Sequence, residues 1–379
     1  MKPNTENPLR ALGGLGQSVW LDFIRRELIQ SGELTRLIRE DDVRGLTSNP
    51  AIFEKAMAGG AEYEAGILAG AASGMDVRAL YESLAIEDIR AAADLMLAVH
   101  RESRGADGFV SLEVSPELAH DTQGTLAEAR RLWRAVDRPN LMIKVPGTPA
   151  GLPAVRALIA EGISVNVTLL FARAAYEATA EAYLAGLEQR LASGGELGSV
   201  ASVASFFVSR IDATVDALLE GRASQVAGPE AVNLLSLRGK IAIANARLAY
   251  ARFGELMSGD RWKRLAAAGA RPQRLLWAST GTKNAAYRDV LYVEELIGPQ
   301  TVNTLPPATL AAFRDHGVAR PTLDSGTAEA SEAMRWLERA GIDLDAETDR
   351  LLAEGVAQFE EAFAKLLAAL QVRLAALAA

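Results

Sequence analysis

The chain has 379 residues, of which 49% are hydrophobic and 23% charged, and its formal net charge is −8. This composition is typical of a soluble globular protein with a sizeable core, organised as one large domain or two modest ones. The negative charge argues against a nucleic-acid-binding surface, and the lack of cysteine excludes disulfides, thiolate metal sites and cysteine nucleophiles.

The N-terminal segment, residues 1–14, mixes charged residues with prolines and lacks the apolar core of a secretory signal. No uncharged apolar run approaches the ~20 residues that cross a bilayer. The three histidines, His100, His120 and His316, lack the spacing of metal ligands, so we expect each on the surface or on a helix. These features favour a cytoplasmic protein without membrane or metal partners.

Eight short apolar or β-branched segments recur along the chain, and each is followed by a turn signal and then a helical pattern. We expect strands at residues 18–24, 45–49, 108–114, 140–146, 163–171, 199–211, 274–280 and 301–305. None of the connections resembles a hairpin, so the strands are expected to be parallel.

The connecting segments have helical periodicity. Apolar residues share one helical face within residues 86–97 and within residues 126–136. A short helix is expected at residues 152–159, ended by Gly162, and a longer one at residues 172–191.

Eight such units favour an α/β fold of the closed (β/α)8, or TIM barrel, type. No GxGxxG motif follows the first strand, which disfavours a Rossmann fold. A barrel needs ~250 residues, so additional helices are expected at 50–104, at 220–273 and after Pro321. We predict a single domain over residues 1–379, with the barrel core at about 18–310 and C-terminal helices at 321–379 packed on it.

An apolar stripe runs along the C-terminal tail at helical spacing: Val356, Phe359, Phe363, Leu366 and Leu370. Such a stripe is typical of a helix that packs against the barrel, and less often of a helix that binds a partner. We expect the first arrangement.

One lysine, Lys144, interrupts the apolar run Leu141-Met142-Ile143-Lys144-Val145-Pro146. Burial favours the neutral amine, and a neutral amine can attack a ketone carbonyl. Lys144 is therefore a candidate Schiff-base nucleophile. On this stretch alone, a lysine that is ion-paired or extends to solvent at a strand end remains an alternative.

Polar residues at the C-terminal ends of barrel strands face the catalytic mouth. The residues at such positions are Asp22, Asn49, Glu113, Lys144, Asn166, Thr168, Ser205 and Arg210. Singly, Asp22 could cap the next helix, Asn49 could serve the turn before Pro50, and Thr168 could fill a strand. Several polar strand ends together favour an active site.

These residues occur in motifs of a known family: Trp20-Leu21-Asp22, Thr47-Ser48-Asn49-Pro50, Ser111-Leu112-Glu113-Val114, Ile143-Lys144-Val145-Pro146-Gly147-Thr148, Asn166-Val167-Thr168, Ser205 with Phe207 and Arg210, and Ala278-Ser279 with Lys283-Asn284. From about residue 19 to residue 310 the chain resembles transaldolase in its longer bacterial form, a class I Schiff-base aldolase. The resemblance implies transfer of a dihydroxyacetone unit from sedoheptulose 7-phosphate to glyceraldehyde 3-phosphate. The products would be erythrose 4-phosphate and fructose 6-phosphate, in the non-oxidative pentose phosphate pathway.

The resemblance also implies catalytic roles. Lys144 would form the Schiff base, which supplies an electron sink without metal or cofactor. Glu113, through a water held by Thr168, would assist loss of the carbonyl oxygen, and Asp22 would take the proton of the C4 hydroxyl.

Substrate-binding residues follow in the same way. Asn49 and Asn166 would orient the C1 and C3 hydroxyls. The substrate phosphate needs cations, and Arg210 and Lys283 are the candidates, with Ser205 as a hydrogen-bond donor. For Arg210, a salt bridge to Asp212 or another carboxylate is the alternative. Sugar phosphates are the expected small-molecule partners, and a homodimer is considered as the assembly.

The chain departs from shorter transaldolases in two places: it has Ser205-Phe206-Phe207 where they carry Ser-Pro-Phe, and Lys283 where they carry an arginine. The nearest rival function is a fructose-6-phosphate-aldolase-type lyase, in which water protonates the enamine. Phe207 cannot donate a hydrogen bond to such a water, which favours transfer. A non-catalytic phosphosugar-binding barrel is disfavoured because Lys144, Glu113 and Asp22 are all present.

Overall fold

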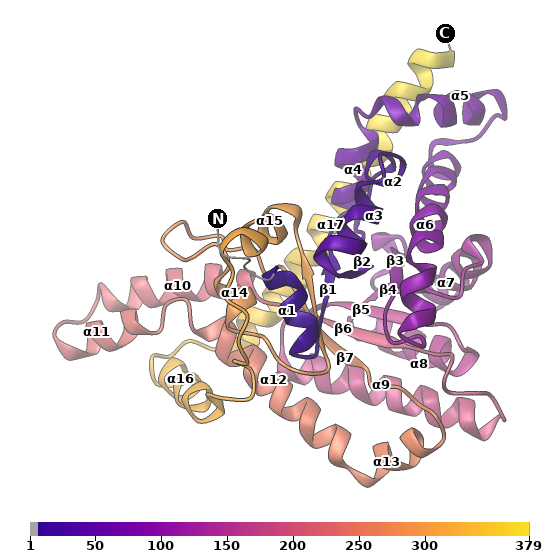
Figure 1. The fold of residues 1–379 in the computed structure, drawn as a ribbon. Helices are drawn as coiled ribbons and strands as arrows, with labels where there is room; N and C mark the ends of the chain where they lie inside the picture. Colours follow the sequence, from indigo (N-terminus) through magenta and orange to yellow (C-terminus); the bar gives the residue numbers. More distant parts are fainter. Residues whose placement is uncertain (1–6, 379) are drawn as a thin grey trace, which may run out of the picture.

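Eight parallel strands close into a barrel in sequence order (Figure 1) in this computed structural model, which describes residues 7–378. The strands are β1 Gln17–Leu21, β2 Val43–Leu46, β3 Phe109–Glu113, β4 Leu141–Pro146, β5 Val165–Leu170, β6 Ser202–Phe207, β7 Arg274–Ala278 and β8 Thr301–Leu305. Each strand pairs with the next, and β8 returns to β1. The predicted (β/α)8 barrel is confirmed.

Helices cover the barrel and extend from it. They are α1 Pro8–Gly14, α2 Arg26–Gln30, α3 Glu33–Asp41, α4 Pro50–Met57, η1 Ala61–Tyr63, α5 Glu64–Ala72, α6 Val77–Glu102, η2 Pro116–Leu118, α7 Thr122–Val136, α8 Gly151–Glu161, α9 Arg173–Ala192, α10 Ser209–Ala223, α11 Pro229–Ser236, α12 Ile241–Ser258, α13 Asp260–Ala267, α14 Leu291–Glu294, α15 Pro307–His316, α16 Thr327–Arg339 and α17 Leu344–Ala378. The three expected insertions are therefore helical.

The sixth strand is shorter than expected. β6 ends at Phe207 and α10 begins at Ser209, so residues 209–211 are helical and Arg210 lies in the first turn of α10. Val208 and Ile211 are buried on either side of Ser209 and Arg210, so buried apolar residues continue past the end of β6 onto the inner face of α10. Strand and helix periodicity cannot be separated at such a junction.

The second strand, β2 Val43–Leu46, begins two residues and ends three residues earlier than expected, and the predicted end at Asn49 is the N-cap of α4. The helix predicted at 152–159 is α8, and Gly162 ends it in the left-handed conformation with φ of 90°. His100 lies on α6, His316 ends α15, and His120 is exposed, as expected.

The C-terminal stripe packs inward. α17 runs diagonally past α4 and ends beside α5 (Figure 1). All five stripe residues from Val356 to Leu370 are buried in the hydrophobic core. The packed helix is therefore correct, and the stripe is not available as a free partner-binding surface.

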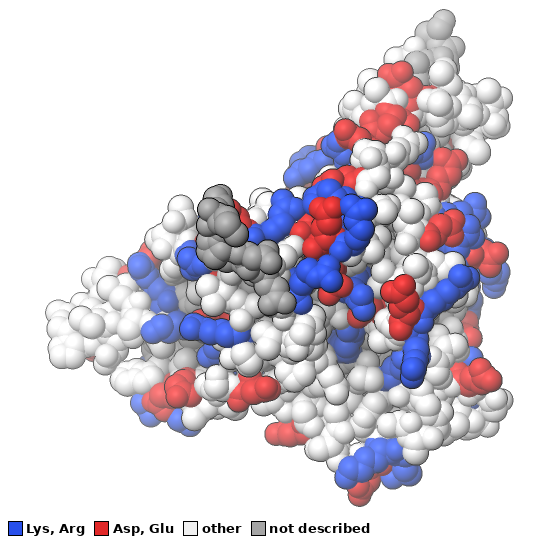
Figure 2. Space-filling model, viewed as in Figure 1, with Lys and Arg blue, Asp and Glu red and all other residues white. Residues whose placement is uncertain are grey.

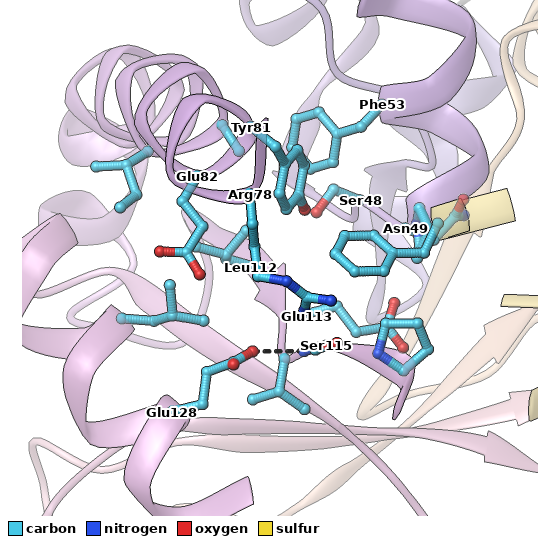
Figure 3. A pocket seen from close by; sticks show the side chains of 17 residues that line it. Ser48, Asn49, Phe53, Arg78, Tyr81, Glu82, Leu112, Glu113, Ser115 and Glu128 are labelled. Carbon is cyan, nitrogen blue, oxygen red and sulfur yellow. Dashed lines mark hydrogen bonds between the residues drawn. The ribbon is translucent and has the colours of Figure 1, made fainter. Parts of the chain in front are cut away.

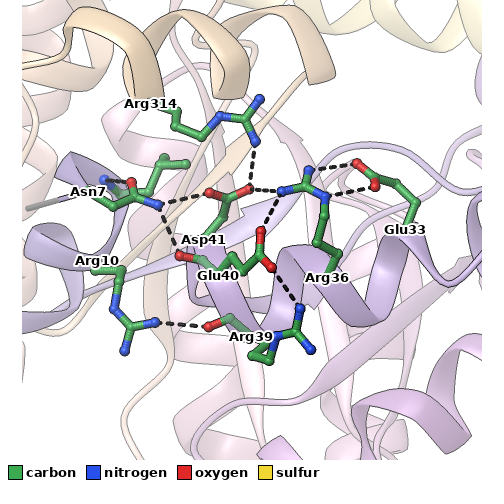
Figure 4. A network of polar contacts seen from close by, with 9 residues as sticks. Asn7, Arg10, Glu33, Arg36, Arg39, Glu40, Asp41 and Arg314 are labelled. Carbon is green, nitrogen blue, oxygen red and sulfur yellow. Dashed lines mark hydrogen bonds and ion pairs between the residues drawn. The ribbon is translucent and has the colours of Figure 1, made fainter.

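A buried carboxylate ties the N-terminal helices to the end of the barrel (Figure 4). Asp41, at the end of α3, accepts hydrogen bonds from Asn7 at 2.8 Å and Arg314 of α15 at 2.9 Å. Arg36 lies 3.6 Å from the same carboxylate. α1, α3 and α15 are thereby held together next to β1 and β8.

The predicted lack of a secretory signal concerned residues 1–14. Residues 1–6 lie outside the described part of the chain, and Pro8–Gly14 form α1. Among the helices within residues 7–378, none combines the length and the apolar character required to cross a bilayer.

Candidate active site

Lys144 lies within β4, and the strand register aligns it with Glu113 of β3 and Asn166 of β5. The side chain is buried, and its ammonium Nζ donates to the carbonyl oxygen of Ser48 at 3.0 Å. Nζ is also 3.4 Å from Oε2 of Glu113. The lysine is therefore both buried and ion-paired, and it does not extend to bulk solvent.

Glu113 is a buried carboxyl with an altered affinity for protons. Burial raises the pKa of Glu113 from 4.5 to about 7; the charge of Lys144 opposes this shift and that of Asp22 adds to it. Neither carboxyl oxygen accepts a well-aligned hydrogen bond from another described residue. A group with a pKa near neutrality can both give and take a proton at physiological pH.

A small cavity of about 20 Å³ lies against the side of Glu113 (Figure 3). Tyr81 of α6 and Glu128 of α7 contribute to its wall, and Glu128 accepts a hydrogen bond from the backbone N–H of Ser115 at 2.6 Å. This volume has room for about one water molecule.

Asp22 follows the last residue of β1. Its Oδ1 accepts a hydrogen bond from Thr47 Oγ1 at 2.6 Å, and Thr47 also contacts Thr304 Oγ1 at 2.8 Å. Burial raises the pKa of Asp22, while the charge of Lys144 and the Thr47 hydroxyl act in the opposite direction. The alternative that Asp22 caps the next helix is wrong, because the N-cap of α2 is Arg25.

A cavity of about 200 Å³ opens at the C-terminal ends of the strands and contains eight of the ten predicted site residues: Asp22, Asn49, Lys144, Thr168, Ser205, Phe207, Arg210 and Lys283. Glu113 reaches it only through its ion pair with Lys144. The cavity is the place where a ketose could meet the amine.

Asn166 is buried and is not one of the residues that line the cavity. Its side chain donates to Ser111 Oγ at 3.1 Å and accepts from Ser205 Oγ at 2.7 Å. This arrangement places Asn166 as a support for Ser205. Asn49 does line the cavity, and its Oδ1 also caps α4 by accepting from the backbone of Ile52 at 3.0 Å.

The hydroxyl of Thr168 is buried at the end of β5 and has no hydrogen-bond partner among the described residues. Buried hydroxyls are usually paired. The free hydroxyl can therefore hold a water molecule or a substrate group.

Besides Lys144, two basic residues of the described chain line the cavity, Arg210 and Lys283. Arg210 is half-buried over the ring of Phe207 at 5.7 Å, and burial lowers its pKa while the charge of Glu354 raises it. None of the ion pairs or side-chain hydrogen bonds within the described residues involves Arg210. The alternative salt bridge to Asp212 is wrong, since Asp212 accepts from the backbone of Ala242 and from Tyr292.

Lys283 is exposed in the loop between β7 and α14 and lies at the rim of the cavity. A half-buried guanidinium and an exposed ammonium at one edge suit an anionic substrate group.

The sequence did not reveal three contributors to this site. Thr47 donates a hydrogen bond to Asp22, and the carbonyl oxygen of Ser48 accepts one from Lys144. Phe359 of α17 lines the cavity, with its ring 5.6 Å from Lys144 Nζ. The apolar spacing of the C-terminal stripe predicts only a packing role for Phe359. The aromatic ring of Phe359 is the one feature in the sequence that could indicate a place in the active site. An aromatic residue is also common in a packed helix interface, so this feature does not separate the two roles.

The described residues contain no group of three or more side chains placed to hold a metal ion. The chemistry that this set of residues can perform is nucleophilic attack by an amine, assisted by two carboxyl groups of raised pKa.

Comparison with known proteins places this geometry in context. The family model described as "Transaldolase/Fructose-6-phosphate aldolase" matches residues 19–370. A protein named "Transaldolase" from Thiobacillus denitrificans is 51% identical over 362 residues, covering 96% of this chain and 99% of that protein. A protein of the same name from Saccharopolyspora erythraea is 50% identical, and the match covers 98% of both chains. Another from Trichodesmium erythraeum is 48% identical, and the match covers 97% of this chain and 98% of the relative.

Proposed function

The chain belongs to the transaldolase/fructose-6-phosphate aldolase family and has transaldolase function, and from this premise we propose that Lys144 is its Schiff-base nucleophile. The observation that carries the proposal is the buried amine of Lys144, 3.4 Å from a carboxyl whose pKa is raised to about 7. The reaction moves a dihydroxyacetone unit between a ketose phosphate and an aldose phosphate.

In the first step, the ammonium of Lys144 gives a proton to Glu113, 3.4 Å away, and the neutral Nζ attacks the C2 carbonyl of the ketose to form a carbinolamine. Its hydroxyl must leave as water, which requires a proton. Glu113 supplies that proton through a water on the Thr168 hydroxyl, and an iminium ion remains at C2.

In the second step, Asp22 takes the proton of the C4 hydroxyl, and the C3–C4 bond breaks. The aldose leaves, and the bonding electrons move into the iminium to give an enamine. The enamine carbon then attacks the carbonyl carbon of the acceptor aldose, Asp22 returns its proton to the new C4 oxygen, and hydrolysis frees the product and Lys144.

The residues that line the cavity suggest how the substrate binds. Arg210 and Lys283 would hold the substrate phosphate, Asn49 the hydroxyls of the three-carbon unit, and Ser205 one further oxygen. Asn166 would act through Ser205, because both of its observed hydrogen bonds are to serine hydroxyls.

Transfer is favoured over release of free dihydroxyacetone by the residues around the amine. Phe207 lines the cavity and has no group that could position a water molecule. No tyrosine is among the described residues that line this cavity.

Three wider proposals accompany the mechanism. The enzyme would act in the cytoplasm, within the non-oxidative pentose phosphate pathway. Residues 1–379 would form one domain, with the barrel core at about 18–310 and helices at 321–379, because buried apolar residues from Leu9 to Leu370 form one cluster.

A homodimer is the proposed assembly. The projecting helix α11 exposes Val232 and Leu235 and carries few charged side chains in Figure 2. Multi-angle light scattering tests this point, and a monomer at micromolar concentration would contradict it.

Borohydride trapping tests the central proposal. Incubation with fructose 6-phosphate and borohydride should add a reduced three-carbon unit to Lys144, located by peptide mass spectrometry. Lys144→Arg keeps the positive charge but cannot form an imine, so it should fold and show no turnover. A label on another lysine, or activity in this variant, would refute the assignment.

A further inference from the structure

The C-terminal helix α17 contributes one residue to the cavity that holds the amine. Phe359 is 6% exposed and lines that cavity together with Asp22, Lys144 and Thr168. Its ring centroid is 5.6 Å from Lys144 Nζ, within the ~6 Å over which a cation is attracted to an aromatic face.

The position of Phe359 is fixed by contacts on both sides along one face of α17. Four residues before it, Gly355 passes the end of β5 so closely that an added Cβ would lie 3.0 Å from Leu169 Cδ2. Leu169 is itself in the left-handed region, with φ of 62°. Residues four apart lie on the same side of a helix, so this close approach turns Phe359 toward the strand ends.

Four residues after Phe359, Phe363 makes an edge contact with Tyr81 at 5.3 Å, and Tyr81 makes another with Phe53 at 5.9 Å. Beyond Phe363, Leu366 is fully buried. α17 is thus held against α4 and α6, and its aromatic side chain is a fixed part of the cavity wall.

We propose that Phe359 is a specificity-determining residue that keeps water away from the enamine on Lys144, so that the three-carbon unit is transferred and not released. This inference rests on the proposed Schiff-base function of Lys144. It assigns to α17 a role in the outcome of the reaction in addition to its packing.

The chemistry gives the reason. The enamine can react with an acceptor aldose, or it can take a proton from water at its nucleophilic carbon. In the second case an iminium forms again, water adds to C2, and the C–N bond breaks. Free dihydroxyacetone leaves and the amine of Lys144 is restored. Exclusion of water from a closed site suppresses such side reactions, and a phenylalanine ring offers water no hydrogen bond.

The test measures a ratio: free dihydroxyacetone formed from fructose 6-phosphate, divided by product transferred to an acceptor aldose phosphate. Phe359→Ala should raise this ratio about tenfold or more, and Phe359→Leu, which keeps an apolar side chain, about threefold. Leu366→Ala is the matched control, because it truncates a buried residue on the same helix that does not line the cavity. It should leave the ratio within about twofold of wild type.

Circular dichroism and thermal unfolding establish that each variant is folded. If Phe359→Ala does not fold, the comparison of Phe359→Leu with Leu366→Ala decides. An unchanged ratio in a folded Phe359 variant that still transfers overturns the inference, and so does an equal increase in Leu366→Ala. Failure of the proposed function would look different, since the wild-type enzyme would then yield no borohydride adduct on Lys144.

Discussion

The protonation of Glu113 gives a prediction that can be worked out quantitatively. The folded protein raises the pKa of this buried carboxyl from 4.5 to about 7. At ~1.4 kcal/mol per pH unit, this displacement corresponds to about 3 kcal/mol of difference between the two protonation states. Glu113→Gln removes the titration and nearly preserves the shape of the side chain.

The linkage between proton binding and folding determines whether the folded state gains or loses stability as the pH rises. Below about pH 4.5 the carboxyl is protonated in both the folded and the unfolded chain, and it makes no pH-dependent contribution. As the pH rises, the unfolded chain loses its proton first, because its pKa is lower. The folded state therefore loses stability between about pH 4.5 and pH 7. Relative to Glu113→Gln, the wild-type protein should lose about 3 kcal/mol of unfolding free energy between pH 4.5 and pH 8.

Urea unfolding of both proteins across this range measures the effect, with tryptophan fluorescence as the signal. Groups that titrate without interacting with Glu113, such as the buried Asp212, are present in both proteins and cancel in the difference. Glu360→Gln, an exposed substitution on α17, is the control and should show no such trend. A difference that stays constant with pH, or one in which the wild type gains stability as the pH rises, would refute the reasoning.

Two further predictions concern substrate and proton binding. Arg210→Lys should raise KM for a sugar phosphate about tenfold and leave kcat within about twofold, because an ammonium lacks the bidentate fork of a guanidinium. Steady-state kinetics with phosphorylated and unphosphorylated ketoses measures this change in KM. An equal loss of activity on both kinds of ketose would contradict a role of Arg210 in phosphate binding. Thr47→Val removes the hydroxyl 2.6 Å from Asp22. Since that hydrogen bond lowers the pKa of Asp22, its loss should move the acidic limb of the kcat profile upward by about one pH unit, and an unmoved limb would separate Thr47 from this proton transfer.

Much of the fold could be predicted because its signals are local. Each barrel strand is a short apolar run closed by a turn residue, and strand ends converge by the rule of the fold. Lys144 was recognisable because a lysine in such a run is unusual. The junction between β6 and α10 was less predictable, because buried apolar residues such as Phe207 and Ile211 occur on both sides of it.

The remaining features depend on contacts between segments distant in sequence. Phe359 is more than two hundred residues from Lys144, and nothing in its own helix distinguishes it from Phe363, which contacts Tyr81 instead. Likewise, Asn166 and Ser205 both follow the expected pattern of the barrel mouth. The finding that the first supports the second requires the hydrogen bond between them, at 2.7 Å.

The charged groups around the amine of Lys144 explain how a buried site can form a Schiff base without a change in its net charge. Lys144 contributes one cation, while Glu113 and Asp22 contribute two carboxyl groups whose pKa values are both raised. Two ionised carboxylates beside a single cation repel each other, and burial favours the protonated form of each carboxyl group. An iminium has the same charge as the ammonium that it replaces. Schiff-base formation therefore leaves the buried charge unchanged. Because the charge of Lys144 lowers the pKa of Glu113, removal of that charge should raise the pKa of Glu113 above its wild-type value.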